Sequence, residues 1–257
     1  MLKQRIMTAL ILLPIVVSAI LYLPNPAFAL LWAAALNLAA WEWSALARLN
    51  SLVSRVIWLC IIDAALLALW FNINVSTVTD TVMLLAAGFW GFVIVSLLFD
   101  ITRRMTDLSA TAYRTVSVAT GMFIIVPAWL ALVLLHQSEP SRVLLVFCLV
   151  WAADTGAYFA GRRFGKRKLA PSISPGKSWE GVVGGLLFSL LFVYVWSVMA
   201  GMPQVEQLPF IIIAILSVMV SIFGDLSGAE MVSEIIDAGD SRDVIGFFFS
   251  SRRRHTR

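Results

Sequence analysis

The stretch LVWAADTGAYFAGRRFGKRKLAPSISPGKSWEGVVGG, residues 149–185, decides the fold class of this chain. Two apolar segments flank a loop that carries six basic residues, and one carboxylate, Asp154, lies inside the first segment. Long apolar segments joined by a basic connection are typical of helices that cross a membrane, with the basic connection on the cytoplasmic side. The stretch therefore predicts two membrane-spanning helices joined by a structured cytoplasmic loop.

The composition of the whole chain agrees with this interpretation. Of its 257 residues, 60% are hydrophobic and 13% are charged, and the mean hydropathy is +0.90. A soluble domain of this length needs far more polar residues to cover its core. We therefore expect an integral membrane protein surrounded by membrane lipids, with no nucleic-acid partner.

Eight segments are apolar enough to cross a bilayer, which takes about 20 residues. They are residues 6–23, 27–47, 56–71, 82–99, 116–135, 143–161, 180–201 and 207–223. Backbone groups find no water to bond in lipid, so these segments must be helices. The sequence predicts an all-α fold, a polytopic transmembrane helical bundle of about eight spans in one domain.

Basic residues fall on alternate connections between these spans. Up to residue 223, thirteen lie on one side of the predicted bundle and one, Arg142, lies on the other. By the positive-inside rule, the N-terminus and the basic connections are cytoplasmic, and eight spans return the C-terminus to the same side. Two alternatives stay open: residues 1–29 also fit a cleaved signal peptide, and residues 102–114 fit either an interfacial helix or a solvated loop.

Two carboxylates are the strongest candidates for function. A carboxylate inside a bilayer is costly, and is therefore usually paired or functional. Asp154, in AADTGA, and Asp225, in FGDLSG, both lie toward the cytoplasmic side. Their small neighbours allow a helix or a ligand to approach closely. We therefore expect a functional role for both.

Other polar residues in the spans favour structural roles. Glu42 lies between two tryptophans and is expected to be an interfacial anchor paired with Arg48. Asp63 either pairs with Arg55 or faces a neighbouring helix, and we assign it no role. His136 is expected at the surface.

The sequence SPGKSWEG, residues 174–181, contains the letters that close a Walker A loop but is not one. Pro171 stands where that motif needs its first glycine, and the flanking segments are membrane helices. The residues still suit a phosphate. Pro175 and Gly176 are expected to form a tight turn, Lys177 adds a charge, and Ser178 is expected to cap the seventh span, whose N-terminus is partially positive.

Taken together, residues 149–185 closely resemble the corresponding region of the bacterial phosphatidate cytidylyltransferases, or CDP-diglyceride synthases. The stretches SIFGDLSG, AAWEW and MLKQRIMTALILLPIVV are similar to that family too, so the likeness covers about residues 1–227. It implies transfer of a cytidylyl group from CTP to phosphatidic acid, giving CDP-diacylglycerol and pyrophosphate, with Mg²⁺ as the divalent metal. It also implies a homodimer in the bacterial inner membrane, with its active site facing the cytoplasm.

The resemblance also implies roles for individual residues. Asp154 and Asp225 are then catalytic, and Asp225 is a metal ligand. The phosphates of CTP are bound by residues of the basic loop, namely Lys166, Lys168, Ser174, Gly176, Lys177 and Ser178.

The end of the chain departs from the family pattern. After Gly-Asp-Leu the family carries Ser-x-x-Lys-Arg, Lys-Asp, Pro-Gly-His-Gly-Gly and Asp-Arg-x-Asp, whereas this chain reads SGAEMVSEIIDAGDSRDVIGFFFSSRRRHTR. We interpret residues 1–227 as an incomplete cytidylyltransferase domain and residues 228–257 as an aberrant, frame-shifted tail. The family's second metal-binding aspartate is missing, which puts the activity of this chain in question.

Two other functions remain alternatives at this point. One is an ion- or proton-coupled transporter that uses Asp154 and Asp63 as intramembrane sites. The other is a related transferase with a different lipid phosphate, such as a prenol-type acceptor, because the sequence does not define an acyl-binding groove.

Overall fold

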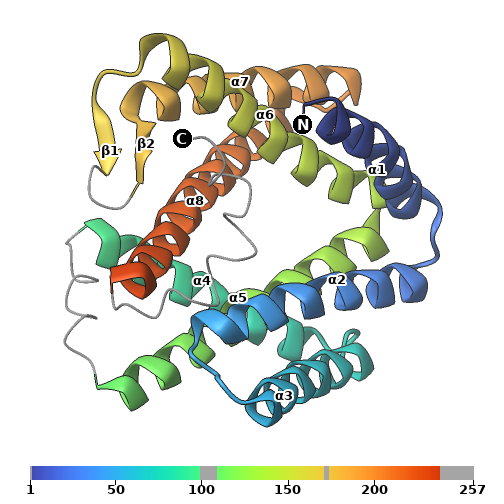
Figure 1. The fold of residues 1–257 in the computed structure, drawn as a ribbon. Helices are drawn as coiled ribbons and strands as arrows, with labels where there is room; N and C mark the ends of the chain where they lie inside the picture. Colours follow the sequence, from blue (N-terminus) through green and yellow to red (C-terminus); the bar gives the residue numbers. More distant parts are fainter. Residues whose placement is uncertain (1, 99–108, 171–173, 238–257) are drawn as a thin grey trace. The chain divides into compact units, whose positions relative to one another are not determined.

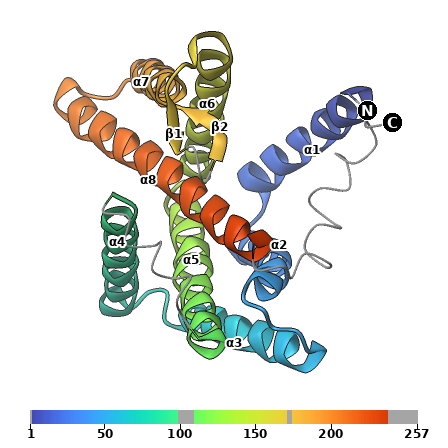
Figure 2. The ribbon, with the colours of Figure 1, turned by 60° about the vertical axis from the view of Figure 1, so that its left-hand side comes forward.

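The computed structural model describes the backbone of residues 2–98, 109–170 and 174–237, shown in Figures 1 and 2. These residues form eight helices and two short strands. In chain order they are α1 (Leu2–Tyr22), α2 (Asn25–Leu46), α3 (Leu52–Phe71), α4 (Ser76–Leu98), α5 (Ala110–Ser138), α6 (Pro140–Phe164), β1 (Lys168–Ala170), β2 (Ser174–Ser178), α7 (Trp179–Met199) and α8 (Gln204–Asp237).

Each of the eight predicted spans overlaps one of these helices along most of its length, which confirms the all-α expectation. Six helices among the described residues are long and apolar enough to cross a membrane, namely α3 to α8. The first helix has a shorter apolar part, Leu10–Tyr22, and α2 is not among the six. Of the stretch 102–114, residues 102–108 lie outside the described residues, and α5 begins at Ala110.

Two helices end in the same hydrogen-bonded motif with different residues at its centre. After α7, Gly201 has a φ of 62° and its N–H bonds to the Val198 carbonyl, while the Met202 N–H bonds to the Ser197 carbonyl. This is a Schellman ending, which favours glycine in the left-handed position. After α2 the same position is taken by Arg48, with a φ of 54°, a conformation that is uncommon for a residue with a side chain.

The described chain divides into two compact units, and each is considered by itself. Unit 1 comprises residues 1–89 and 111–147. Its core is built on large side chains, and the indole N–H groups of three buried or half-buried tryptophans bond to backbone carbonyls of other helices or helix segments. These bonds run from Trp43 to Ser117 (2.8 Å), from Trp58 to Ala40 (3.0 Å) and from Trp129 to Ala29 (2.9 Å).

His136 belongs to the core of unit 1, so its expected surface position is wrong. The side chain is 4% exposed. Its ring stacks on Phe28, with centroids 3.9 Å apart, and its two nitrogens lie 3.0 Å from Asn25 Oδ1 and from the Ile20 carbonyl oxygen. A ring that can bond at both edges is able to join α1, α2 and α5 where a purely apolar side chain cannot.

The partners of Asp63 and Arg48, two polar residues of unit 1, test two further predictions. Asp63 accepts a 2.7 Å hydrogen bond from Asn37 on α2, so it faces a neighbouring helix, one of the two alternatives above. The expected Glu42–Arg48 pair is wrong. The Arg48 guanidinium instead lies over the Tyr113 ring, 4.6 Å from its centroid, because the left-handed backbone at Arg48 follows the end of α2.

Unit 2 comprises residues 90–110 and 148–257. Its core joins α6, α7 and α8 through Leu149, Ala153, Val193, Ala214 and Val218. Figures 1 and 2 both show α7 beside α6, with the β1–β2 hairpin between the end of one helix and the start of the other.

Small residues set the distance between α6 and α7. A Cβ atom added at Gly156 would lie 2.5 Å from the Gly184 carbonyl oxygen, and one added at Gly184 would collide with the Ala160 Cβ. A Cβ at Gly185 would lie 2.9 Å from the Ala153 carbonyl oxygen. The two backbones therefore touch, which is the contact that small residues allow between membrane helices.

Candidate functional site

The basic loop between α6 and α7 folds back on itself as a two-stranded antiparallel hairpin. Strand β1 pairs with β2 so that Lys168 lies opposite Ser178, and the Trp179 N–H bonds to the Arg167 carbonyl oxygen at 3.0 Å. Pro175 and Gly176 lie within β2, so the expected tight turn at these two residues is wrong. The register between the two strands shifts here, between the Lys168–Ser178 and Ala170–Ser174 pairs.

The seventh predicted span begins as the sequence indicated. Ser178 is the N-cap of α7, and its hydroxyl accepts a 3.2 Å hydrogen bond from the Gly181 N–H. The Glu180 carboxylate, in the first turn of α7, accepts a bond from the Arg167 N–H at 3.2 Å. An acidic residue in the first helical turn also complements the helix dipole. Both ends of the hairpin are therefore fixed to the start of α7.

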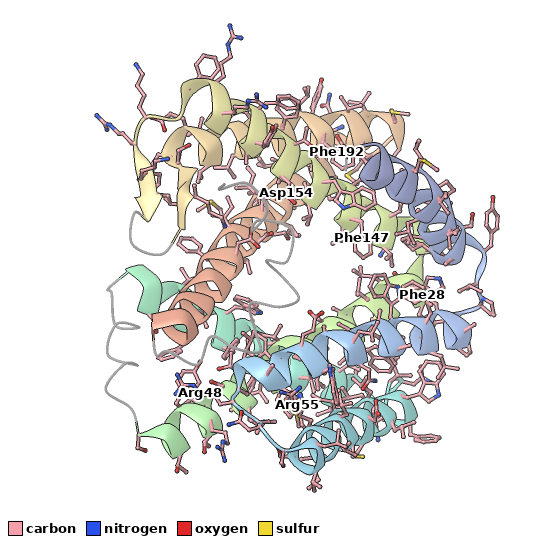
Figure 3. All side chains as sticks on the ribbon, in the orientation of Figure 1. Phe28, Arg48, Arg55, Phe147, Asp154 and Phe192 are labelled. Atoms are coloured by element: carbon pink, nitrogen blue, oxygen red, sulfur yellow. The ribbon has the colours of Figure 1, made fainter. Side chains whose placement is uncertain are left out.

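Lys177 and Asp225 meet in this unit, although they are 48 residues apart. The Lys177 Nζ lies 3.1 Å from Asp225 Oδ2, and the two side chains are 31% and 62% exposed. Asp154, labelled on α6 in Figure 3, is exposed and lies close enough to both charges to interact with them electrostatically. The structure thus pairs the predicted phosphate-binding lysine with Asp225, and Asp154 lies within electrostatic range of both.

The remaining predicted phosphate-binding residues are arranged along the hairpin and its approach. Lys166, Lys168 and Gly176 are exposed, and Ser178 is buried. Ser174 opens β2, and its side chain lies outside the described residues. Four cations from this loop, Lys166 to Lys168 and Lys177, thus flank the capped N-terminus of α7, a position that favours anions.

Sequence reasoning missed the part played by Glu180 in closing the hairpin. In the sequence, Glu180 indicated only an acidic residue at the start of the seventh predicted span. The bond that it accepts from Arg167 depends on the strand pairing, which the residue pattern did not predict.

The carboxylates present fit a metal ion bound in part by its substrate. Among the described residues, no three His, Cys, Asp or Glu side chains gather as a complete metal site. Asp225 and Asp154 offer oxygen ligands on exposed side chains, and Mg²⁺ is often held by one or two carboxylates together with substrate phosphates. These carboxylate oxygens suit Mg²⁺. Asp225 is more exposed than Lys177, its partner in the ion pair.

The fold and these residues agree with what the chain is similar to. The model of the cytidylyltransferase family matches residues 3–231. The chain belongs to this family. It is 40% identical over 232 residues to the phosphatidate cytidylyltransferase of Pseudomonas aeruginosa, covering 88% of this chain and 82% of the relative.

Other relatives carry the same description. The phosphatidate cytidylyltransferase of Haemophilus influenzae is 34% identical over 247 residues, covering 88% of this chain and 84% of the relative. That of Bacillus subtilis is 31% identical over 115 residues, covering 43% of this chain and 40% of the relative. The resemblance inferred from residues 149–185 is confirmed, and family membership favours the transferase over the transporter.

Proposed function

We propose that this protein transfers the cytidylyl group of CTP to phosphatidic acid. A phosphate oxygen of phosphatidic acid attacks the α-phosphorus of CTP, the new P–O bond forms, and the bond to the leaving pyrophosphate breaks. The products are CDP-diacylglycerol and pyrophosphate. The observation that carries the proposal is the Lys177–Asp225 pair beside Asp154, at the capped start of α7, in a chain that matches its family over residues 3–231.

The chain's own residues have distinct tasks in this reaction. The N-terminus of α7 and the hairpin cations bind and orient the triphosphate, because partial and full positive charges converge there. Lys177 neutralises charge on a phosphate, which is the main requirement of phosphoryl and nucleotidyl transfer. Asp154 and Asp225 would hold Mg²⁺, which supplies further neutralisation of phosphate charge when bound.

The placement in the membrane belongs to the same proposal. All eight helices span the membrane, both ends of the chain lie in the cytoplasm, and the site faces the cytoplasm at the bacterial inner membrane. The thirteen-to-one distribution of basic residues supports this orientation. A homodimer carries over from the resemblance alone, and the mass of the detergent-solubilised protein would test it.

The direct test measures CDP-diacylglycerol formed from CTP and phosphatidic acid with Mg²⁺ present. It uses this chain and a chimera in which residues 1–227 continue into the C-terminal part of the Pseudomonas aeruginosa relative. We expect Asp225→Asn to lower the rate in the active protein about 100-fold or more, because a metal ligand supports several kcal/mol of charge stabilisation. The matched control is Asp63→Asn, the same change at a residue of unit 1 that bonds to Asn37.

The outcomes separate the parts of the proposal. Activity in the chimera but not in this chain would assign the missing function to the tail. An unchanged rate in the Asp225→Asn variant would remove Asp225 from the metal site. Faster reaction with a prenol-type phosphate in competition with phosphatidic acid would change the lipid substrate and keep the transferase.

A further inference from the structure

A groove lies along the contact between α6 and α7, and none of the residues assigned above belongs to it. Its volume is about 630 Å³, within the usual range of ligand sites. The lining residues come only from these two helices: Gly156, Phe159, Ala160, Arg162, Arg163 and Phe164 from α6, and Gly184, Leu187 and Phe188 from α7.

The groove exists because the two helices are so close. Gly156 and Gly184 let the two backbones touch along the seam, and Phe188 packs across Gly156. Phe159 and Leu187, on either side, are 61% and 59% exposed. The floor and walls are therefore apolar and open outward.

One end of the groove is positively charged. Arg162 and Arg163 lie in the last turn of α6, where the basic loop begins. The Arg162 guanidinium donates a 2.8 Å hydrogen bond to the Tyr158 hydroxyl, and that of Arg163 lies 5.7 Å from the Phe164 ring centroid. Arg163 comes seven positions after Gly156 in α6. The arginines therefore lie about 10 Å along the helix axis from the apolar floor at Gly156.

The groove opens on a different face of α6 from the candidate catalytic site. At 100° per residue, Gly156 and Arg163 lie about 160° and 180° around the helix from Asp154, and Arg162 lies about 80° from it. An acyl chain along Gly156 therefore lies away from Asp154, and a phosphate at Arg162 and Arg163 lies about 12 Å or more along the helix from Asp154. This separation distinguishes the occupant from the reacting lipid.

We propose that the α6–α7 groove binds an anionic glycerophospholipid of the surrounding leaflet as a non-reacting lipid. The phosphate lies at Arg162 and Arg163, where charges at a membrane surface attract anionic headgroups. One acyl chain lies along Phe159, Leu187 and Phe188. Charge complementarity and the apolar floor select this occupant, and the inference does not depend on the proposed transfer reaction.

The test is native mass spectrometry of the full chain in detergent, titrated separately with phosphatidylglycerol, phosphatidylcholine and phosphatidic acid. We expect one phosphatidylglycerol to be retained. Arg162→Gln with Arg163→Gln should weaken its binding about tenfold or more. The matched control removes two exposed arginines outside the groove and the basic loop, Arg114→Gln with Arg142→Gln, and should leave binding unchanged.

A second pair of variants tests the apolar part. Leu187→Trp fills the groove and should prevent retention, whereas Leu191→Trp changes an equally exposed leucine one turn further along α7 and should not. Equal binding of phosphatidylcholine, or unchanged binding of phosphatidylglycerol by the double groove variant, would each overturn the proposal. If the unsubstituted protein is a dimer that retains no lipid, and Leu187→Trp makes it monomeric, the groove binds a second copy of the chain instead.

Discussion

Unit 1 and unit 2 hold their helices together in opposite ways. Unit 1 uses large rings, and its tryptophans reach across to backbone carbonyl groups, as Trp129 does to Ala29. Unit 2 uses the absence of side chains, with Gly156 and Gly184 bringing α6 and α7 into backbone contact. Lipid is as apolar as leucine, so burial alone does not drive helices together. Helices in lipid are therefore held together by close packing and by hydrogen bonds between them. Unit 1 relies mainly on hydrogen bonds, and unit 2 relies mainly on close packing.

The two kinds of helix packing differ also in whether the unit carries residues of the candidate site. The charges assigned to the reaction are all in unit 2, where Lys177 pairs with Asp225 and Asp154 lies within electrostatic range of both. In unit 1 the pair Asn37–Asp63 joins two helices and has no assigned role. Close backbone packing therefore accompanies the candidate site, whereas ring packing accompanies the unit that has none.

The largest effect should come from filling the contact between α6 and α7. Gly184→Leu places a side chain on Ala160 and should lower the free energy of unfolding by about 3 kcal/mol, since overpacking forces backbone shifts. Thermal unfolding in detergent measures it. Gly91→Leu, at a glycine of unit 2 with open space around its Cβ position, is the control. Equal stability of the two variants would mean that close packing does not hold unit 2 together.

A smaller effect is expected from removing one indole bond in unit 1. Trp129→Phe keeps an aromatic ring but loses the bond to Ala29, which should cost about 1 kcal/mol. The same unfolding measurement applies. Trp196→Phe in unit 2, where the ring packs against Phe192, should cost less. If Trp196→Phe lowers the free energy of unfolding more than Trp129→Phe does, the proposed contrast between the units is wrong.

The smallest change in stability is expected at the ion pair of the candidate site. Lys177→Met should alter the free energy of unfolding by no more than about 0.5 kcal/mol, because partly exposed ion pairs contribute little. The rate of CDP-diacylglycerol formation should nevertheless fall more than tenfold, because a phosphate loses its counter-charge. Arg142→Met breaks the exposed Arg142–Glu139 pair of unit 1 and should change neither quantity. A normal rate in Lys177→Met would exclude Lys177 from phosphate binding.

The positions of the helices followed from the sequence, but their ends did not. Apolar runs mark only the part of a helix that suits lipid, whereas backbone bonding continues into polar residues. Helix α8 was expected over residues 207–223 and runs from Gln204 to Asp237, which places Asp225 within a helix. Similarly, the hydroxyl of Ser178 caps α7 as predicted, because capping depends on residues three positions apart.

Contacts between distant segments were predicted unevenly. The meeting of Lys177 with Asp225 was anticipated only as a gathering of opposite charges on one side of the membrane. The Glu42–Arg48 pair failed because a positive φ at Arg48 depends on how the chain leaves α2. Burial of His136 depends on partners more than 100 residues away, Asn25 and Ile20. Such partners have no local signal in the sequence.

The hairpin closed at Arg167, Trp179 and Glu180 has a consequence for affinity. A flexible loop that wraps a triphosphate loses conformational entropy at the moment of binding, and that loss subtracts from the binding free energy. Here the strand pairing orders Lys168 and Lys177 when the chain folds. These two lysines are preorganised, so under the proposed function more of their attraction to a nucleotide is expected to be measured as affinity.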